Sequence, residues 1–139
     1  MSFLETVVRA AGLGQLALAA ASTAIPAVLG WRRETAMLRP LTRQVFWTYA
    51  GYILGIHVGY GLLSSLRPAS LLDGSPLATA VTGFIALHWG VRLALQLLVF
   101  DRRDAPPGWH VRAAEASLVT LFVVLTVVYG VAWAANLRR

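Results

Sequence analysis

The stretch AAEASLVTLFVVLTVVYGVAWAAN, from Ala113 to Asn136, carries a single charged side chain, Glu115. A helix needs about 20 consecutive apolar residues to cross a hydrocarbon core about 30 Å thick. Three earlier stretches have similar length and character, at about residues 12–31, 44–66 and 76–100. Inside hydrocarbon, backbone amides must be paired within their own segment, so each stretch is predicted to be helical. The sequence therefore predicts one all-α transmembrane domain over residues 1–139, an integral membrane four-helix bundle with short loops.

The composition leads to the same class of protein. Of the 139 residues, 58% are hydrophobic and 13% are charged. Ordinary soluble domains carry about 25% charged residues. A soluble domain of this size leaves about a third of its unfolded surface exposed, which so few charges do not cover. Intrinsic disorder is excluded because it requires low hydrophobicity.

The polar residues exclude several functions. There is no cysteine, which excludes disulfides, thiolate metal sites and thiol redox chemistry. No GxSxG nucleophile motif is present, and no carboxylate falls in the middle of a predicted span. The net charge of +6 comes from 12 arginines without lysine, a usage typical of GC-rich bacterial genomes. These arginines are spread among loops and do not form one basic module, so no nucleic-acid partner is predicted.

The arginines also indicate an orientation. Loops with more basic residues stay in the cytoplasm. The first and third predicted loops lie on the same side of the membrane. That side carries Arg32, Arg33, Arg39, Arg43, Arg102, Arg103 and Arg112. The opposite side carries fewer arginines: Arg9, Arg67, Arg138 and Arg139. We therefore expect a multi-pass protein of the bacterial inner membrane, with both termini in the periplasm.

The second predicted helix has a face made of glycine. Gly51, Gly55 and Gly59 recur every four residues and so lie along one side of a helix. Such a stripe lets another helix backbone approach closely, and this packing drives association in lipid. The pattern predicts a tight helix contact, either within this chain or with a second copy.

A polar group is expected near the cytoplasmic ends of the helices. Arg92 and Gln96 lie on one face of the third helix, and Glu115 enters the fourth helix at a similar level. Arg43 and Gln44 at the start of the second helix complete the group. One interpretation is a pocket for an anionic group such as a lipid head group. The other is a structural Arg92–Glu115 pair that fixes the third helix against the fourth.

His57 and His88 are expected at about the same depth on neighbouring antiparallel helices, near the bilayer midplane. Two such histidines are the axial ligand pair of a haem b, and Arg92 would face a propionate. Under this alternative the chain is an electron-transfer membrane protein that interacts with quinone. The other interpretation pairs each histidine across helices with a hydroxyl, of Tyr60, Ser64, Thr120 or Thr126.

Two segments resemble a known kind of protein. LTRQVFWTYAGYI, from Leu41 to Ile53, and FIALHWGVRLALQLLVFD, from Phe84 to Asp101, are similar to segments of short, uncharacterised four-span bacterial membrane proteins. The resemblance implies a fold and a location but no activity.

The main functional hypothesis is a non-enzymatic protein without a cofactor. It would be a helix-packing subunit or a lipid-binding component of a membrane assembly. Its partners would be membrane lipid and either further copies of itself or a larger membrane complex.

Overall fold

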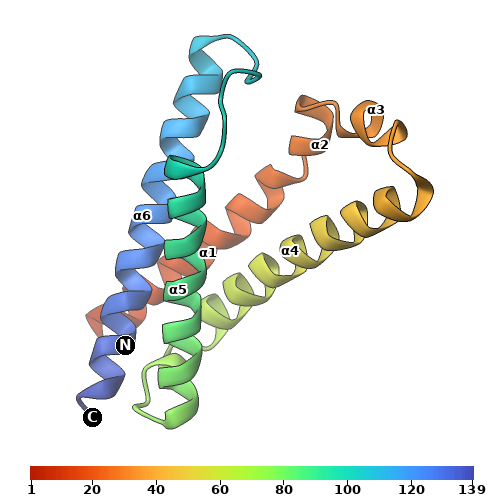
Figure 1. Cartoon of the computed structure of the whole chain (residues 1–139). Coiled ribbons are helices and arrows are strands. Elements are labelled where there is room, and N and C mark those ends of the chain that lie inside the picture. The colour runs from red at the N-terminus through yellow and green to blue at the C-terminus, as the bar shows by residue number, and fades with distance from the viewer.

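The computed structural model describes all 139 residues, and it is helical throughout, with no strand. Four long helices are joined by short turns, and a pair of short helices lies between the first two long ones (Figure 1). The elements are α1 (Phe3–Ser22), α2 (Ile25–Val28), α3 (Trp31–Ala36), α4 (Pro40–Leu66), the 3₁₀ turn η1 (Ala69–Leu71), α5 (Pro76–Leu98) and α6 (Trp109–Leu137).

Local sequence signals set the starts of three long helices. Ser2 and Glu5 form a capping box at α1, because each side chain accepts a hydrogen bond from the other residue's backbone N–H. Pro40 occupies the first turn of α4, where its missing N–H costs nothing. At α5 the Ser75 hydroxyl accepts from the backbone N–H of Ala78, and Pro76 follows the cap.

The expected bounds of the first helix, residues 12–31, are wrong. The capping box starts α1 at Phe3, and the helix ends at Ser22. Beyond it the chain turns at Thr23 and Ala24, forms the single turn of α2, and turns again at Gly30, which has a left-handed φ of 64°. Residues from Trp31 onward, expected mostly as a loop, form the short helix α3. The other three predicted helices agree with α4, α5 and α6 to within a few residues at each end.

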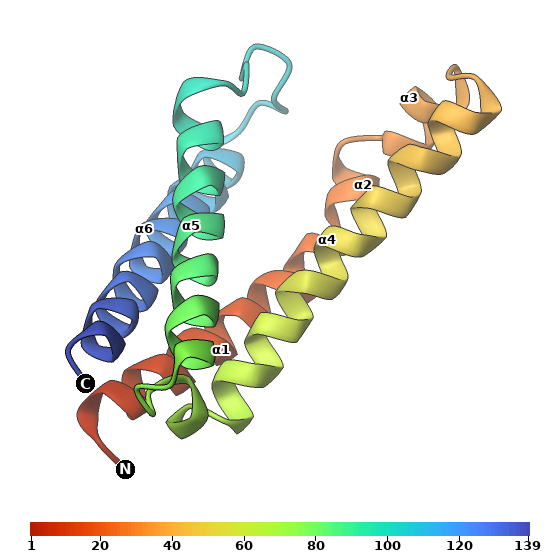
Figure 2. The same cartoon turned by 60° about the horizontal axis from the view of Figure 1, so that its bottom comes forward.

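The long helices form two antiparallel pairs. α1 packs against α4, and α5 packs against α6 (Figures 1 and 2). The pairs meet where α1 touches α6 and splay apart towards the opposite end. A compact protein of 15.0 kDa exposes about 7,000 Å², whereas this chain exposes 9210 Å². The expected closed four-helix bundle is therefore an open arrangement of two helix pairs.

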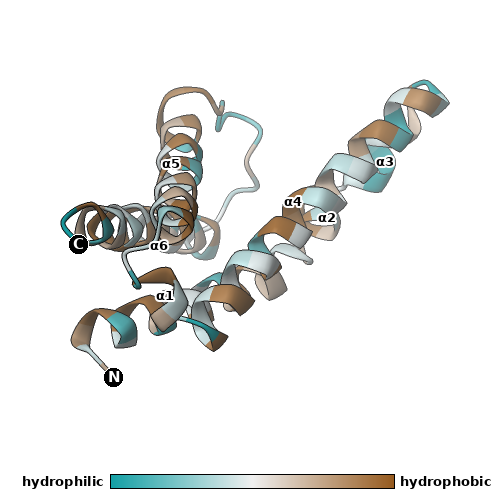
Figure 3. Ribbon diagram, turned by 90° about the horizontal axis from the view of Figure 1, so that it is seen from below, coloured by the Kyte–Doolittle hydropathy of each residue, from teal (hydrophilic) through white to brown (hydrophobic).

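Three helical segments are long and apolar enough to cross a membrane: Phe3–Val28, Pro76–Leu98 and Trp109–Leu137. α4 is as long as they are but is not among them, because glycine, tyrosine and His57 replace aliphatic residues along it. Many large hydrophobic side chains of α5 and α6 are exposed, and Figure 3 shows hydrophobic segments in both helices. Such large exposed apolar faces indicate association with a membrane.

Two glycines allow α1 and α4 to cross closely. A Cβ added to Gly12 would lie 2.6 Å from the backbone nitrogen of Ser65. A Cβ added to Gly61 would lie 2.7 Å from the Leu16 side chain. Both distances are shorter than a Cβ atom can keep from another heavy atom. The two backbones therefore approach to a separation that only glycine permits.

This crossing gives a first prediction. Gly12→Ala should lower the thermal unfolding temperature in detergent, since overpacking of this kind costs about 1–3 kcal/mol. Gly14→Ala is the matched control, because a Cβ there would lie 3.5 Å from the Leu121 side chain, an ordinary contact. Circular dichroism melts of the two variants check this. Equal unfolding temperatures for both variants and the wild type would show that the crossing tolerates a methyl group.

Candidate functional site

A set of four buried polar side chains, the polar hub, joins all four long helices. The hub consists of Gln15 on α1, Ser64 on α4, Trp89 on α5 and Tyr129 on α6, and all four are fully buried. The Gln15 side-chain nitrogen donates to the Tyr129 hydroxyl at 2.6 Å, and the Trp89 Nε1 donates to the Gln15 Oε1 at 3.0 Å. The Ser64 and Tyr129 hydroxyl oxygens lie 2.5 Å apart.

The hub positions the helices because its polar atoms bond to one another, apart from one 3.5 Å bond from the Gln15 side-chain nitrogen to the Ala11 carbonyl within α1. An unpaired polar group in hydrocarbon costs several kcal/mol, so each helix is held at the register that completes the bonds. Around the hub lie the apolar residues Leu18, Ile85, Phe122 and Leu125. Of these four residues, only Ser64 was considered from the sequence, as a partner of a histidine, because spacing along one helix does not indicate which faces meet.

A further polar cluster closes the end of the fold that holds both termini. The Asn136 side-chain amide donates to the backbone carbonyl of Leu71 at 2.8 Å, and its oxygen accepts from the backbone N–H of Gly74 at 3.1 Å. Arg139 donates to the carbonyl of Leu72. These contacts fix the end of α6 to the turn between α4 and α5, and no motif in the sequence indicated them.

His57 and His88 meet, as their predicted depth required. Their Nε2 atoms lie 3.1 Å apart, a direct hydrogen bond in which one imidazole donates and the other accepts. The His57 ring stacks on Trp89 with centroids 4.8 Å apart, and Trp89 stacks on Phe122 at 5.5 Å. The histidines therefore join α4 to α5, but with each other and not with a hydroxyl group.

This geometry does not favour the haem alternative. Two nitrogens on opposite sides of one metal are about 4 Å apart, twice a metal–nitrogen bond of about 2 Å. The observed 3.1 Å leaves no space for a porphyrin between the rings.

The Tyr60 hydroxyl is the one buried side-chain polar atom without a hydrogen-bond partner. Its ring packs edge-on against His88, with centroids 5.3 Å apart.

No group of three or more His, Cys, Asp or Glu side chains lies close enough together to hold a metal ion.

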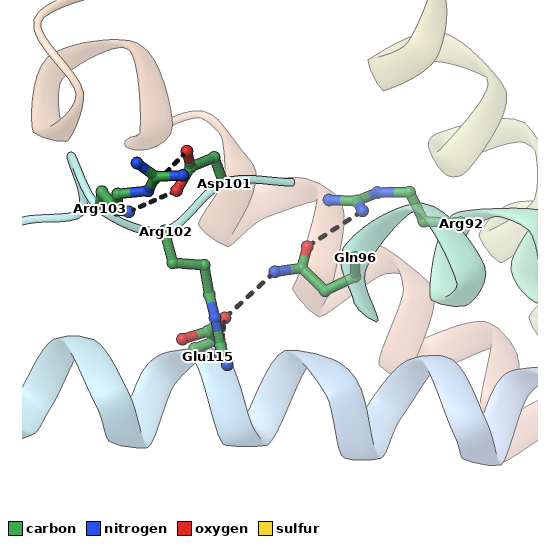
Figure 4. A network of polar contacts seen from close by, with 6 residues as sticks. All are labelled: Arg92, Gln96, Asp101, Arg102, Arg103 and Glu115. Carbon is green, nitrogen blue, oxygen red and sulfur yellow. Dashed lines mark hydrogen bonds and ion pairs between the residues drawn. The ribbon is translucent and has the colours of Figure 1, made fainter. Parts of the chain in front are cut away.

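Arg92, Gln96 and Glu115 come together at the far end of α5 and α6, as Figure 4 shows. Arg92 donates to the Gln96 Oε1 at 3.1 Å, and the Gln96 side-chain nitrogen donates to a Glu115 oxygen at 3.3 Å. The expected direct Arg92–Glu115 pair is therefore bridged by Gln96. Arg102 pairs with Glu115 directly at 2.5 Å. The Arg92 guanidinium also lies over the Phe122 ring, 4.8 Å from its centroid.

Arg43 and Gln44 lie elsewhere. Both are exposed near the start of α4, which the splayed arrangement holds away from α5 and α6 (Figure 1). Arg43 instead lines a hollow beside α3, together with Arg32 and Trp47. The predicted five-residue pocket is thus divided between two places, because the helix pairs diverge at this end.

The glycine face of α4 is open. An added Cβ at Gly51, Gly55 or Gly59 would meet nothing within 4 Å. Close packing within the chain uses Gly12 and Gly61 between α1 and α4, and Gly83 of α5 against Trp133 of α6, none of which the four-residue spacing indicated.

Comparison of this chain with protein-family models, curated proteins and solved structures finds no match. The resemblance of Leu41–Ile53 and Phe84–Asp101 to four-span bacterial membrane proteins therefore stays a prediction. Any functional conclusion depends on the geometry described above.

The polar hub gives a second prediction. Tyr129→Phe should lower the free energy of unfolding by about 1–3 kcal/mol, because it leaves the buried amide of Gln15 and the Ser64 hydroxyl short of a partner. Tyr49→Phe is the control, since Tyr49 is exposed. Reversible unfolding in detergent measures both. A Tyr129→Phe variant as stable as Tyr49→Phe would show that the hub does not hold the helices together.

Proposed function

We propose that this chain is a small four-span membrane protein that works by packing against another membrane component through α4. The observation that carries the proposal is the open stripe of Gly51, Gly55 and Gly59. Helices in lipid gain no hydrophobic driving force from meeting, so close backbone packing at small residues supplies the association energy. Inside the chain, Gly12 and Gly61 already show what such packing looks like.

Two features support a contact outside the chain. The same face of α4 carries Leu62 and Leu66, which are also exposed. The chain exposes far more surface than a compact protein of its mass, and the two helix pairs splay apart at the end where α4 begins. A partner helix on the glycine face would bury part of this surface. A second copy of the chain or a subunit of a larger assembly would fit equally.

Support for a fourth span comes from the pairing of α4 with α1. α4 has 27 residues and is therefore about 40 Å long at about 1.5 Å per residue. It runs antiparallel to α1, which is within a segment apolar enough to cross. Both termini then lie at one membrane surface, and the arginine-rich segments at the other. In a bacterial inner membrane, the positive-inside rule makes the side with the termini the periplasmic side.

The association gives a third prediction. Gly55→Leu should block the close approach of a partner helix and reduce the mass of the detergent-solubilised particle. Gly130→Leu is the matched control, because Gly130 on α6 also has open space around its Cβ position. Light scattering coupled to size exclusion measures the particle mass. An unchanged mass in Gly55→Leu, with a wild-type particle larger than one chain, would refute the contact through α4.

The fourth span gives a fourth prediction, which exploits the absence of cysteine from the chain. Single substitutions Met37→Cys, before α4, and Asp73→Cys, after it, should react with an impermeant maleimide from opposite sides of the membrane. Both positions are exposed and near turns. The one bond lost, from the Ser75 backbone N–H to Asp73 at 2.8 Å, lies in the turn before α5, so the long helices should still form. Labelling of both from one side would show that α4 does not cross.

A further inference from the structure

A hollow of about 360 Å³ lies between α3 and the beginning of α4, outside the contacts described so far. Its lining residues are Arg32, Thr35, Ala36, Arg43 and Trp47. The Trp47 Nε1 donates to the Thr35 hydroxyl at 3.3 Å, and this hydroxyl donates to the Trp31 carbonyl at 2.7 Å. Thr35 is buried. The hollow thus has a base of hydrogen-bonded residues that fixes α3 against α4.

Two uncompensated positive charges line this hollow. The ion pairs of the chain join Arg33 to Glu34, Arg102 to Glu115 and Arg103 to Asp101. Arg32 and Arg43 are in none of them. The guanidinium group presents a planar set of donors that matches phosphate oxygens, and it does so in pairs of hydrogen bonds. The hollow is therefore complementary to a phosphate group.

The position of the hollow along the helices indicates what kind of molecule would supply the phosphate. The apolar segment that includes α1 and α2 ends at Val28, and α4 begins at Pro40. Trp31 begins α3 just after this segment and packs against Trp47 near the start of α4, with ring centroids 6.1 Å apart. Tryptophan is enriched where the hydrocarbon meets the head groups. The two arginines therefore lie at the depth of lipid phosphates.

A second hollow of about 690 Å³ adjoins the first, and Thr35 lines both. Leu29, Trp31, Leu38 and Phe46 give it an apolar part. Arg33, Glu34 and Asp104 also line it, and Arg33 pairs with Glu34 at 3.8 Å. The two carboxylates outnumber the one guanidinium there, so a phosphate is favoured at Arg32 and Arg43 instead. This arrangement suits an amphiphile with an anionic phosphate at one end and a hydrocarbon portion at the other.

We propose that the hollow between Arg32 and Arg43 binds the phosphate of an anionic phospholipid, whose glycerol and upper acyl segments lie in the adjoining hollow. This inference deepens the proposed function, because it depends on the membrane placement of α4. It does not depend on association through the glycine face, so either idea can fail alone.

Native mass spectrometry of the full chain in detergent, titrated with phosphatidylglycerol or phosphatidylcholine, tests the proposal. Arg32→Gln with Arg43→Gln should weaken phosphatidylglycerol binding about thirtyfold, as expected for about 1 kcal/mol per basic residue at a lipid surface. Arg39→Gln with Arg67→Gln is the control, because it removes the same charge outside both hollows. Arg32→Lys with Arg43→Lys should bind more weakly than wild type and more tightly than the glutamine pair.

Three results would overturn the proposal. One is equal loss of binding in the control pair, which would indicate a general charge effect. Another is equal binding of phosphatidylcholine, which would show no preference for an anionic lipid. The third is equally tight binding of soluble glycerol phosphate, which would make this a site for free phosphate. The particle mass, measured on the same samples, should stay unchanged in the glutamine pair, and Gly55→Leu should retain the lipid.

Discussion

The structure depends on the need to pair the polar side chains that are buried between the apolar helices, a need that every buried side-chain polar atom except the Tyr60 hydroxyl meets. Gln15, Ser64, Trp89 and Tyr129 meet this need only together, and each comes from a different long helix. Because an unpaired group costs several kcal/mol in hydrocarbon, the hub fixes both the depth and the rotation of all four helices. The His57–His88 bond and the Arg92–Gln96–Glu115 chain extend the same principle to the upper parts of α4, α5 and α6.

Two sets of glycines have different consequences in this fold. Gly12 and Gly61 bring α1 and α4 together within the chain, whereas Gly51, Gly55 and Gly59 meet nothing. Beyond the hub the helix pairs diverge, so Arg43 at the α3 end of α4 lies apart from Arg92 on α5. The open glycine face is where we propose that a partner helix packs, and the hollow beside α3 is where we propose that a phosphate binds.

Much of the secondary structure could be predicted from the sequence, and part of the site. Length and apolarity located α4, α5 and α6 to within a few residues, and equal depth brought His57 and His88 together. The first helix was misplaced because its capping box lies outside the most apolar stretch. Arg43 and Gln44 were wrongly grouped with Arg92, since a shared level along the helices says nothing about lateral distance when two helix pairs splay apart.

The sequence by itself determined the class of protein, because hydrophobic composition and segment length are local properties that need no knowledge of neighbours. It also determined the polar faces of the helices through their periodicity. Only the tertiary structure decided which faces meet, which glycines are used and which are open, and that Gln96 lies between Arg92 and Glu115. The physical reason is that a helical pattern fixes the direction of a side chain around its own axis, while the crossing of two helices depends on the fit of all the side chains between them.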